Sequence, residues 1–221
     1  MGRIKLVIFD LDGTLADTLP DISAALERVV SKYGSFGDLQ ALVRRSIGNG
    51  AQKLVERVYK ALGITAGNIL DDLAEYRAAY AANSCIKTAL YPNTLSVLQA
   101  LKEKEMQMAV ATMKPRESTA VVLEKLGIRP YFSTVLSADD MHAPKPDPWS
   151  VYFCAQKAGV APQQALIIGD SMTDVGAGKA SGAVSVAVLS GYSGREKMQE
   201  SGADYLVEEI GGLLPILERL G

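Results

Sequence analysis

The sequence predicts an α/β fold in which a parallel β-sheet carries helices on both faces. Short apolar runs, such as residues 5–9 and 165–168, have the continuous hydrophobicity of strands that are buried on both sides. Helical patterns separate these runs, and such an alternation is typical of parallel strands joined by crossover helices. Glycines end several of the helical segments, as at Gly127, Gly159 and Gly182, where they can adopt the conformation that stops a helix.

The alternation can be followed along most of the chain. We expect strands over residues 5–9, 107–111, 134–136, 165–168, 184–188 and 205–207. We expect the intervening helices over residues 93–105, 115–127, 147–159 and 171–182. No internal repeat and no low-complexity linker interrupts this order.

One interval departs from the alternation, because it contains no convincing strand between the first strand and the helix at residue 93. Its patterns predict helices over residues 20–33, 38–46, 51–62 and 69–82. Thr18 and Asp21 predict a capping box at the start of the first of them. A crossover needs only about a dozen residues. We therefore expect a small all-helical domain, residues 17–89, inserted into an α/β core of residues 1–16 and 90–221.

Composition narrows the class of protein. The chain has 221 residues and a net charge of −2, whereas nucleic-acid binders usually show a basic excess. No apolar run approaches the ~20 residues of a membrane helix, and the first strand begins too early to leave room for a signal peptide. Cys85 and Cys154 lie outside any metal-ligand spacing. We expect a cytoplasmic monomer or homodimer with no nucleic-acid or membrane partner.

Polar side chains follow four of the expected strands. Asp10 and Asp12 come directly after the first strand, Thr112 and Lys114 after the second, and Lys145 after the third. The fourth strand leads into the sequence GDSMTD, which contains Asp170 and Asp174. Ligands of open parallel sheets bind outside the carboxyl ends of the strands. We therefore expect these side chains to meet at one edge of the sheet.

The carboxylates among them predict a magnesium site. Asp10 and Asp12 lie about 6–7 Å apart along an extended chain, so each raises the cost of ionising the other. A bound Mg²⁺ offsets that repulsion, because it prefers oxygen ligands and is commonly held by one or two carboxylates with substrate phosphate. Lys145 and Thr112 then offer a charge and a hydrogen-bond donor to phosphate oxygens.

These four motifs, in this order, resemble the haloacid dehalogenase superfamily, whose Rossmann-like core carries a mobile helical cap. The resemblance implies that Asp10 is the nucleophile that forms an aspartyl-phosphate, and that Asp12 is the general acid and base. It also implies a Mg²⁺ shell of Asp10, the Asp12 backbone carbonyl and Asp170, supported by Asp174. The family's dehalogenases lack the second aspartate, so Asp12 favours phosphoryl transfer. Met113 replaces the asparagine of the family's Thr-Asn-Lys motif and retains only a backbone donor for the phosphate.

The segment RRSIGNGA in the expected helical domain resembles that of phosphoglycolate phosphatases. Free N–H groups at Gly48, Asn49 and Gly50, with Arg44 and Arg45 nearby, are suited to hold a carboxylate. In the alternative interpretation the glycines only form a turn and the arginines only face solvent. We therefore expect a small phosphorylated metabolite as substrate, with 2-phosphoglycolate as the leading candidate.

Other functions are compatible with parts of this pattern. Another capped phosphatase, for nucleotides or pyrophosphate, and a sugar phosphomutase share the same motifs. A receiver domain that accepts a phosphoryl group on Asp10 is disfavoured by the inserted helices and by Asp12. Lys114 is either a charge beside the substrate or a residue that begins a helix, His142 is not needed by the mechanism, and Trp149 is expected to pack structurally.

Overall fold

The computed structural model describes residues 4–221, and its core is a six-stranded sheet in which every pairing is parallel. The strands lie in the order β5-β4-β1-β6-β7-β8. Their bounds are β1 (Leu6–Phe9), β4 (Gln107–Ala111), β5 (Thr134–Leu136), β6 (Ala165–Gly169), β7 (Val184–Val188) and β8 (Tyr205–Val207). The predicted strands are confirmed to within one residue at each end.

The order of the strands places a switch point at the centre of the sheet. The chain builds outward from β1 through β4 to β5, then returns to the other side of β1 and builds β6, β7 and β8. Beside β1 the direction of winding reverses, and this is where open α/β sheets bind ligands. Asp10 follows β1 and Asp170 follows β6, so both lie at that point.

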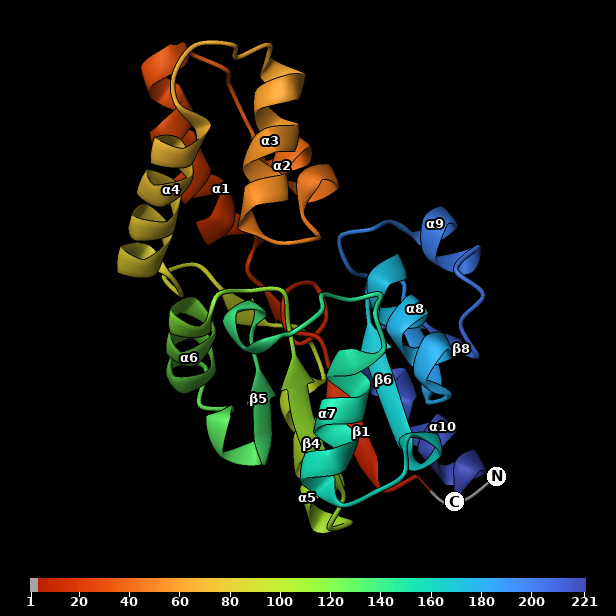
Figure 1. The fold of residues 1–221 in the computed structure, drawn as a ribbon. Coiled ribbons are helices and arrows are strands. Elements are labelled where there is room, and N and C mark those ends of the chain that lie inside the picture. Colours follow the sequence, from red (N-terminus) through yellow and green to blue (C-terminus); the bar gives the residue numbers. More distant parts are fainter. Residues whose placement is uncertain (1–3) are drawn as a thin grey trace.

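Helices cover both faces of the sheet, as the sequence predicts (Figure 1). Alternate residues of β1 point to opposite faces, with Leu6 and Ile8 in one apolar cluster and Val7 and Phe9 in another. The first cluster contains residues of α7 (Trp149–Ala158) and α8 (Met172–Ser181). The second contains residues of α5 (Thr94–Glu103), α6 (Arg116–Lys125) and α10 (Leu213–Leu220).

Four further helices form a separate layer above the carboxyl ends of the strands (Figure 1). They are α1 (Leu19–Val30), α2 (Gln40–Ser46), α3 (Ala51–Leu62) and α4 (Ile69–Asn83). We call this segment, residues 19–83, the helical unit. It has its own apolar cluster, which Tyr192 joins from the loop after β7.

The expectation that no strand interrupts this region was wrong. Two short strands, β2 (Ala16–Asp17) and β3 (Ala89–Leu90), pair antiparallel where the chain enters and leaves the helical unit. Strands of two residues are too short to show an alternating pattern in sequence. The sequence also left unpredicted the short α9 (Arg195–Gln199) and the terminal α10. None of the helices described has the length and apolar character needed to cross a membrane.

Candidate active site

Lys145 lies between two carboxylates at the edge formed by the carboxyl ends of the strands of the sheet, which we call the catalytic edge. Its Nζ atom donates to Oδ1 of Asp10 at 3.0 Å and to Oδ1 of Asp174 at 2.5 Å, and it also donates to the carbonyl oxygen of Ala111 at 2.8 Å. Lys145 is only 2% exposed, so these partners replace its water shell. The structure thus brings together residues from three strand ends, as their positions in the sequence predict.

Asp170 lies close to Asp10 with little room around its side chain. Its Oδ2 atom accepts the backbone N–H of Tyr192 at 2.5 Å. A Cβ atom added to Gly13 would lie 2.4 Å from that oxygen, and one added to Gly191 would lie 2.1 Å from the Cβ of Asp170. Gly13 also has a φ of +84°, which disfavours other residues. Two glycines therefore allow the backbone to close around Asp170.

Burial makes the charges of this cluster costly. It raises the pKa of Asp10 from 3.8 to about 7, because the attraction of Lys145 does not offset desolvation and the repulsion of Asp174 and Asp12. Burial likewise raises the pKa of Asp170 well above its usual range, with repulsion from Asp10 and Asp174 adding to it. Although burial alone would lower the pKa of Lys145, the facing carboxylates raise it.

The acidic cluster has the composition of a magnesium site. One carboxylate oxygen from each of Asp10, Asp170 and Asp174 lies within 4.8 Å of the others. When these groups and Asp12 are ionised, four carboxylates face two ammonium groups, those of Lys114 and Lys145. The excess of two negative charges equals the charge of one divalent cation. The residues therefore fit Mg²⁺, which favours oxygen ligands and carboxylates.

Asp12 is fixed by two neighbours that the sequence did not assign to it. Its Oδ1 atom accepts the hydroxyl of Thr18 at 2.7 Å and the ammonium of Lys114 at 2.9 Å. The predicted capping box at Thr18 was wrong, because Thr18 makes no side-chain cap. Asp21 instead accepts backbone N–H groups of residues 86–88. Of the two interpretations of Lys114, the structure favours a site residue, since it is 4% exposed and paired with Asp12.

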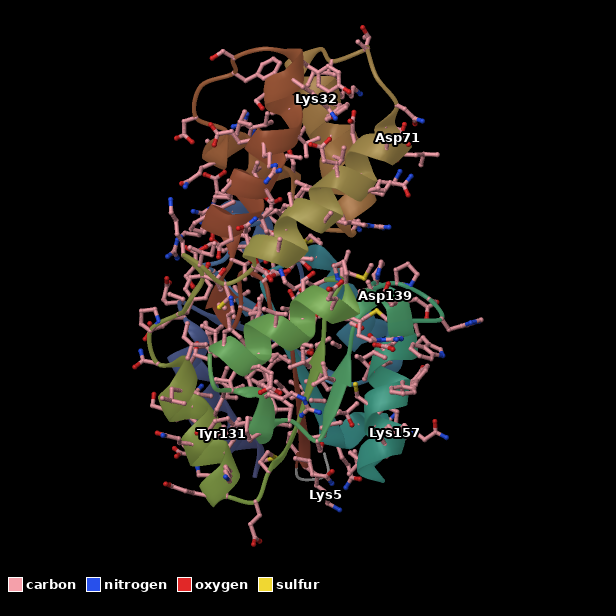
Figure 2. All side chains as sticks on the ribbon, turned by 90° about the vertical axis from the view of Figure 1, so that its left-hand side faces the viewer. Lys5, Lys32, Asp71, Tyr131, Asp139 and Lys157 are labelled. Carbon is pink, nitrogen blue, oxygen red and sulfur yellow. The ribbon has the colours of Figure 1, made fainter. Side chains whose placement is uncertain are left out.

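A cavity of about 600 Å³ separates the catalytic edge from the helical unit. Its lower wall includes Asp10, Asp12, Thr112, Lys114, Lys145 and Asp170. Its upper wall includes Ile22, Asn49, Leu54, Tyr76, Arg77 and Tyr80. Asp139 also lines the cavity, and its label in Figure 2 marks the height of the cavity between the sheet and the helical unit. The labels of Lys32 and Asp71 mark the far end of the helical unit.

The loop after β4 and the loop before α3 approach each other across this cavity. Thr112 is buried, and its hydroxyl accepts the backbone N–H of Lys114 at 3.2 Å. Met113, Gly48, Asn49 and Gly50 all line the cavity, and all three residues 48–50 have positive φ. This unusual loop is held by Arg57, whose guanidinium donates to Ser46, Gly48 and Asn49. Sequence reasoning missed Arg57, which lies on α3.

Arg44 and Arg45 do not reach the cavity. Arg44 donates to the carbonyl oxygen of Gly191 at 2.8 Å and lies over the Tyr192 ring, while Arg45 is exposed. The exposed His142 lies outside the cavity lining, with its ring 6.3 Å from that of Trp149. Trp149 packs structurally as expected, since it stacks on Phe153 with 5.0 Å between ring centroids.

Tyr192 connects the catalytic edge to the start of the helical unit. Its phenol oxygen accepts the backbone N–H groups of Thr18 at 2.7 Å and Leu19 at 3.0 Å, and donates to Asp17 at 2.9 Å. Its backbone N–H meets Asp170, as described above. Sequence reasoning gave Tyr192 no role, although it follows the expected strand at residues 184–188 and therefore belongs to the same sheet edge.

Comparison with known proteins agrees with this geometry. The family model of haloacid dehalogenase-like hydrolases matches residues 7–188, which contain all four motifs. The chain belongs to this hydrolase family. The resemblance based on the motifs after four strands is therefore confirmed.

Individual relatives within the family are similar to this chain over almost its whole length. A phosphoglycolate phosphatase of Pseudomonas putida is 36% identical over 216 residues, which cover 96% of this chain and 79% of that protein. One from Haemophilus influenzae is 34% identical and covers 97% of this chain and 99% of its own. The crystal structure of a predicted phosphoglycolate phosphatase from Haemophilus somnus has a TM-score of 0.90 at 30% identity, and the match covers 98% of this chain and 99% of that one.

Proposed function

We propose that this hydrolase is a Mg²⁺-dependent phosphatase that hydrolyses a small phosphomonoester through an aspartyl-phosphate on Asp10. The observation that carries the proposal is the arrangement at the cavity floor. Asp10 lies beside Lys145, Asp170 and Asp174, while Asp12 stands apart, bonded to Lys114 and Thr18. Two aspartates two positions apart thus have different surroundings, as two different catalytic roles require.

In the first step, a carboxylate oxygen of Asp10 attacks the phosphorus atom and the bond from phosphorus to the ester oxygen breaks. Asp12 gives its proton to the departing oxygen, so an alcohol leaves. Lys145 donates to Asp10 and places a positive charge beside the incoming phosphoryl group. The Thr112 hydroxyl and the backbone N–H of Met113 bind phosphate oxygens in this proposal, which is supported by the position of both residues in the cavity lining.

In the second step, Asp12 takes a proton from a water molecule, whose oxygen attacks the phosphorus of the aspartyl-phosphate. The bond from phosphorus to Asp10 breaks, inorganic phosphate leaves, and the Asp10 carboxylate is restored. Asp10, Asp170 and the Asp12 carbonyl, with support from Asp174, would hold Mg²⁺, which would supply positive charge against the phosphate. The raised pKa values of Asp10 and Asp170 support this assignment, because a cation favours their ionised forms.

We propose 2-phosphoglycolate as the leading substrate. The support comes from the names of the relatives at 34–36% identity, which span almost all of this chain. The cavity also places the residue 48–50 loop and the start of α3 opposite the phosphate-binding wall, where N–H groups are suited to an anionic second group.

We further propose that residues 17–89 act as a mobile cap on a core formed by residues 1–16 and 90–221. The pairing of β2 with β3 supports these limits, because the two segments in which the chain passes between core and cap lie side by side there. Closure of such a cap removes water from the reacting groups. Cys85 and Cys154 are free, which suits a reducing compartment, so the cytoplasm is the proposed location. A small metabolite is the proposed partner, and the enzyme acts as a monomer or homodimer.

The experiment that tests the function measures phosphate release from small phosphomonoesters with Mg²⁺, in parallel with a chelator and with the Asp10→Asn variant. The esters are 2-phosphoglycolate, a nucleoside monophosphate and a sugar phosphate, and the anhydride pyrophosphate is tested beside them. We expect strong preference for 2-phosphoglycolate, abolished by chelator and by D10N. Preference for another compound would change the assigned substrate and leave the proposed mechanism in place. Isomerisation of the sugar phosphate without phosphate release would identify a mutase instead.

A further inference from the structure

Among residues 4–221, four cationic side chains line the cavity, and three of them have acidic partners. Lys145 is paired with Asp10 and Asp174, Lys114 with Asp12, and Arg116 with Asp140. The guanidinium of the fourth, the exposed Arg77, makes no hydrogen bond or ion pair with residues 4–221. Its charge is therefore available to a ligand.

Tyr76, the residue before it, offers a second group to the same space. It is 5% exposed and lines the cavity, yet its hydroxyl makes no hydrogen bond within the described chain. It differs in this from Tyr80, whose unpartnered hydroxyl is fully enclosed by protein. Burial raises the pKa of Tyr76 above its usual range, so its phenol remains a donor at neutral pH.

The geometry of α4 explains why the two groups act together. Residues 76, 77, 80 and 81 all line the cavity, and they form one face of the helix because residues four apart point the same way. The Tyr80 ring lies 4.4 Å from the Lys114 ammonium, so this face of α4 meets the phosphate-binding loop. The Tyr76 and Tyr80 rings stack with centroids 6.2 Å apart, so the two side chains pack against each other on this face.

We propose that Tyr76 and Arg77 recognise a carboxylate on the organic end of the substrate, and so determine specificity for an acidic phosphomonoester. The proposal rests on the phosphatase function, since the phosphate of the same molecule occupies the site at Asp10. Arg77 supplies a charge-assisted hydrogen bond, and Tyr76 donates a second one. The two residues take the part that the sequence suggested for Arg44 and Arg45, which lie away from the cavity.

An alternative partner for Arg77 exists on the opposite wall. Glu117, on α6, also lines the cavity and makes no ion pair with Arg77 in this structure. If cap closure brought the two together, Arg77 would stabilise the closed form for every substrate alike. The test must therefore separate recognition of a carboxylate from closure of the cap.

The experiment compares two substrates that differ only in charge at the organic end, 2-phosphoglycolate and its neutral amide, 2-phosphoglycolamide. The variants are Arg77→Gln, Tyr76→Phe and Glu117→Gln, with Arg28→Gln as the control, because Arg28 is exposed on α1 outside the cavity. We expect R77Q to lower kcat/KM for 2-phosphoglycolate about 10- to 100-fold, mainly through KM, and Y76F about 3- to 10-fold. Neither R77Q nor Y76F should change kcat/KM for the amide by more than about two-fold. E117Q and R28Q should leave kcat/KM for both substrates unchanged.

Binding of both compounds to the inactive D10N protein and its R77Q derivative, measured by calorimetry, provides a readout independent of turnover. If R77Q weakened the binding and turnover of the acid and of the amide equally, and E117Q did the same, the proposal would be overturned and Arg77 would be assigned to cap closure. Equal use of the two substrates by the wild-type enzyme would also overturn it, while leaving the phosphatase function in place. Arg77-dependent binding of 2-phosphoglycolate with no phosphate release from any ester would support the carboxylate site and overturn the phosphatase function.

Discussion

Tyr192 and Asp170 are joined by a hydrogen bond of 2.5 Å from the backbone N–H of the tyrosine to Oδ2 of the aspartate. The phenol of the same tyrosine binds the backbone of Thr18 and Leu19, where α1 begins. A proposed metal ligand and the entry to the helical unit therefore share one residue. This relationship makes the loop after β7 a part of the candidate active site.

We predict that Tyr192→Phe lowers the free energy of unfolding by about 1–3 kcal/mol, because it leaves the buried N–H of Thr18 without an acceptor and removes one of the two acceptors of the Leu19 N–H. The backbone bond to Asp170 is retained, so the effect reports on the phenol alone. Urea denaturation provides the measurement. Tyr152→Phe is the matched control, since Tyr152 is 45% exposed and its change should cost little. Equal losses in the two variants would show that the contacts of Tyr192 with α1 do not stabilise the protein.

We predict that the metal-free protein loses stability as the pH rises from about 4 to 7, and that Asp10→Asn reduces this loss. The pKa of Asp10 is raised from 3.8 to about 7 in the folded state, so in this window the folded protein binds more protons than the unfolded chain. Stability then falls with increasing pH until Asp10 is ionised in both states. Asp170, whose pKa is also raised, leaves part of the slope in the variant.

Thermal or urea denaturation in chelator at several pH values measures this slope. Mg²⁺ should restore stability most strongly at and above pH 7, because its binding requires ionised carboxylates. The same pH dependence in D10N and wild type would mean that Asp10 is already ionised in the acidic range, contrary to the burial seen in the structure.

Most of the fold could be predicted from the sequence, and so could the meeting of polar side chains at one edge of the sheet, because the carboxyl ends of parallel strands lie at the same edge. All six strands of the sheet lie within one residue of the expected bounds, and the polar residues that follow four of them meet at one edge. Tyr192 could have been found by applying the same rule to residues 184–188. The roles of Thr18 and Lys114 depend on contacts 6 and 102 positions away, for which the sequence offers no spacing signal.

The upper wall of the cavity could not be predicted in the same way. Tyr76 and Arg77 lie in a helix with no strong separation of polar and apolar faces, so its pattern does not indicate which side faces the sheet. That side is decided by how α4 packs on α1 and how the unit sits above the strands. For the same reason, Arg44 and Arg45 seemed suitable for an anion in sequence but lie elsewhere in the structure.

We predict that Asp12→Asn lowers kcat on alkyl phosphates by about 10²- to 10⁴-fold, the usual contribution of general acid catalysis. The loss should be much smaller on p-nitrophenyl phosphate, whose phenolate leaves without a proton. Lys114→Met should also lower kcat more on alkyl than on aryl phosphates, but by a smaller factor, because Lys114 positions Asp12 through a hydrogen bond of 2.9 Å. Steady-state kinetics on the two ester types measures both effects. Equal losses on alkyl and aryl esters would speak against Asp12 as the acid.

We predict that Gly13→Ala abolishes activity and weakens Mg²⁺ binding. These losses should exceed what results from placing an alanine in the left-handed backbone conformation alone. The added Cβ would lie 2.4 Å from Oδ2 of Asp170, so either the loop or the carboxylate must move. Gly127→Ala is the matched control: its φ of +69° is comparable to the +84° of Gly13, and a Cβ there meets no atom within 4 Å. That variant should lose only about 1–2 kcal/mol of stability from the left-handed conformation and retain full activity. Calorimetric titration with Mg²⁺ and assays of both proteins separate the two effects. If G13A binds Mg²⁺ as tightly as G127A, then Asp170 does not depend on the close approach of Gly13.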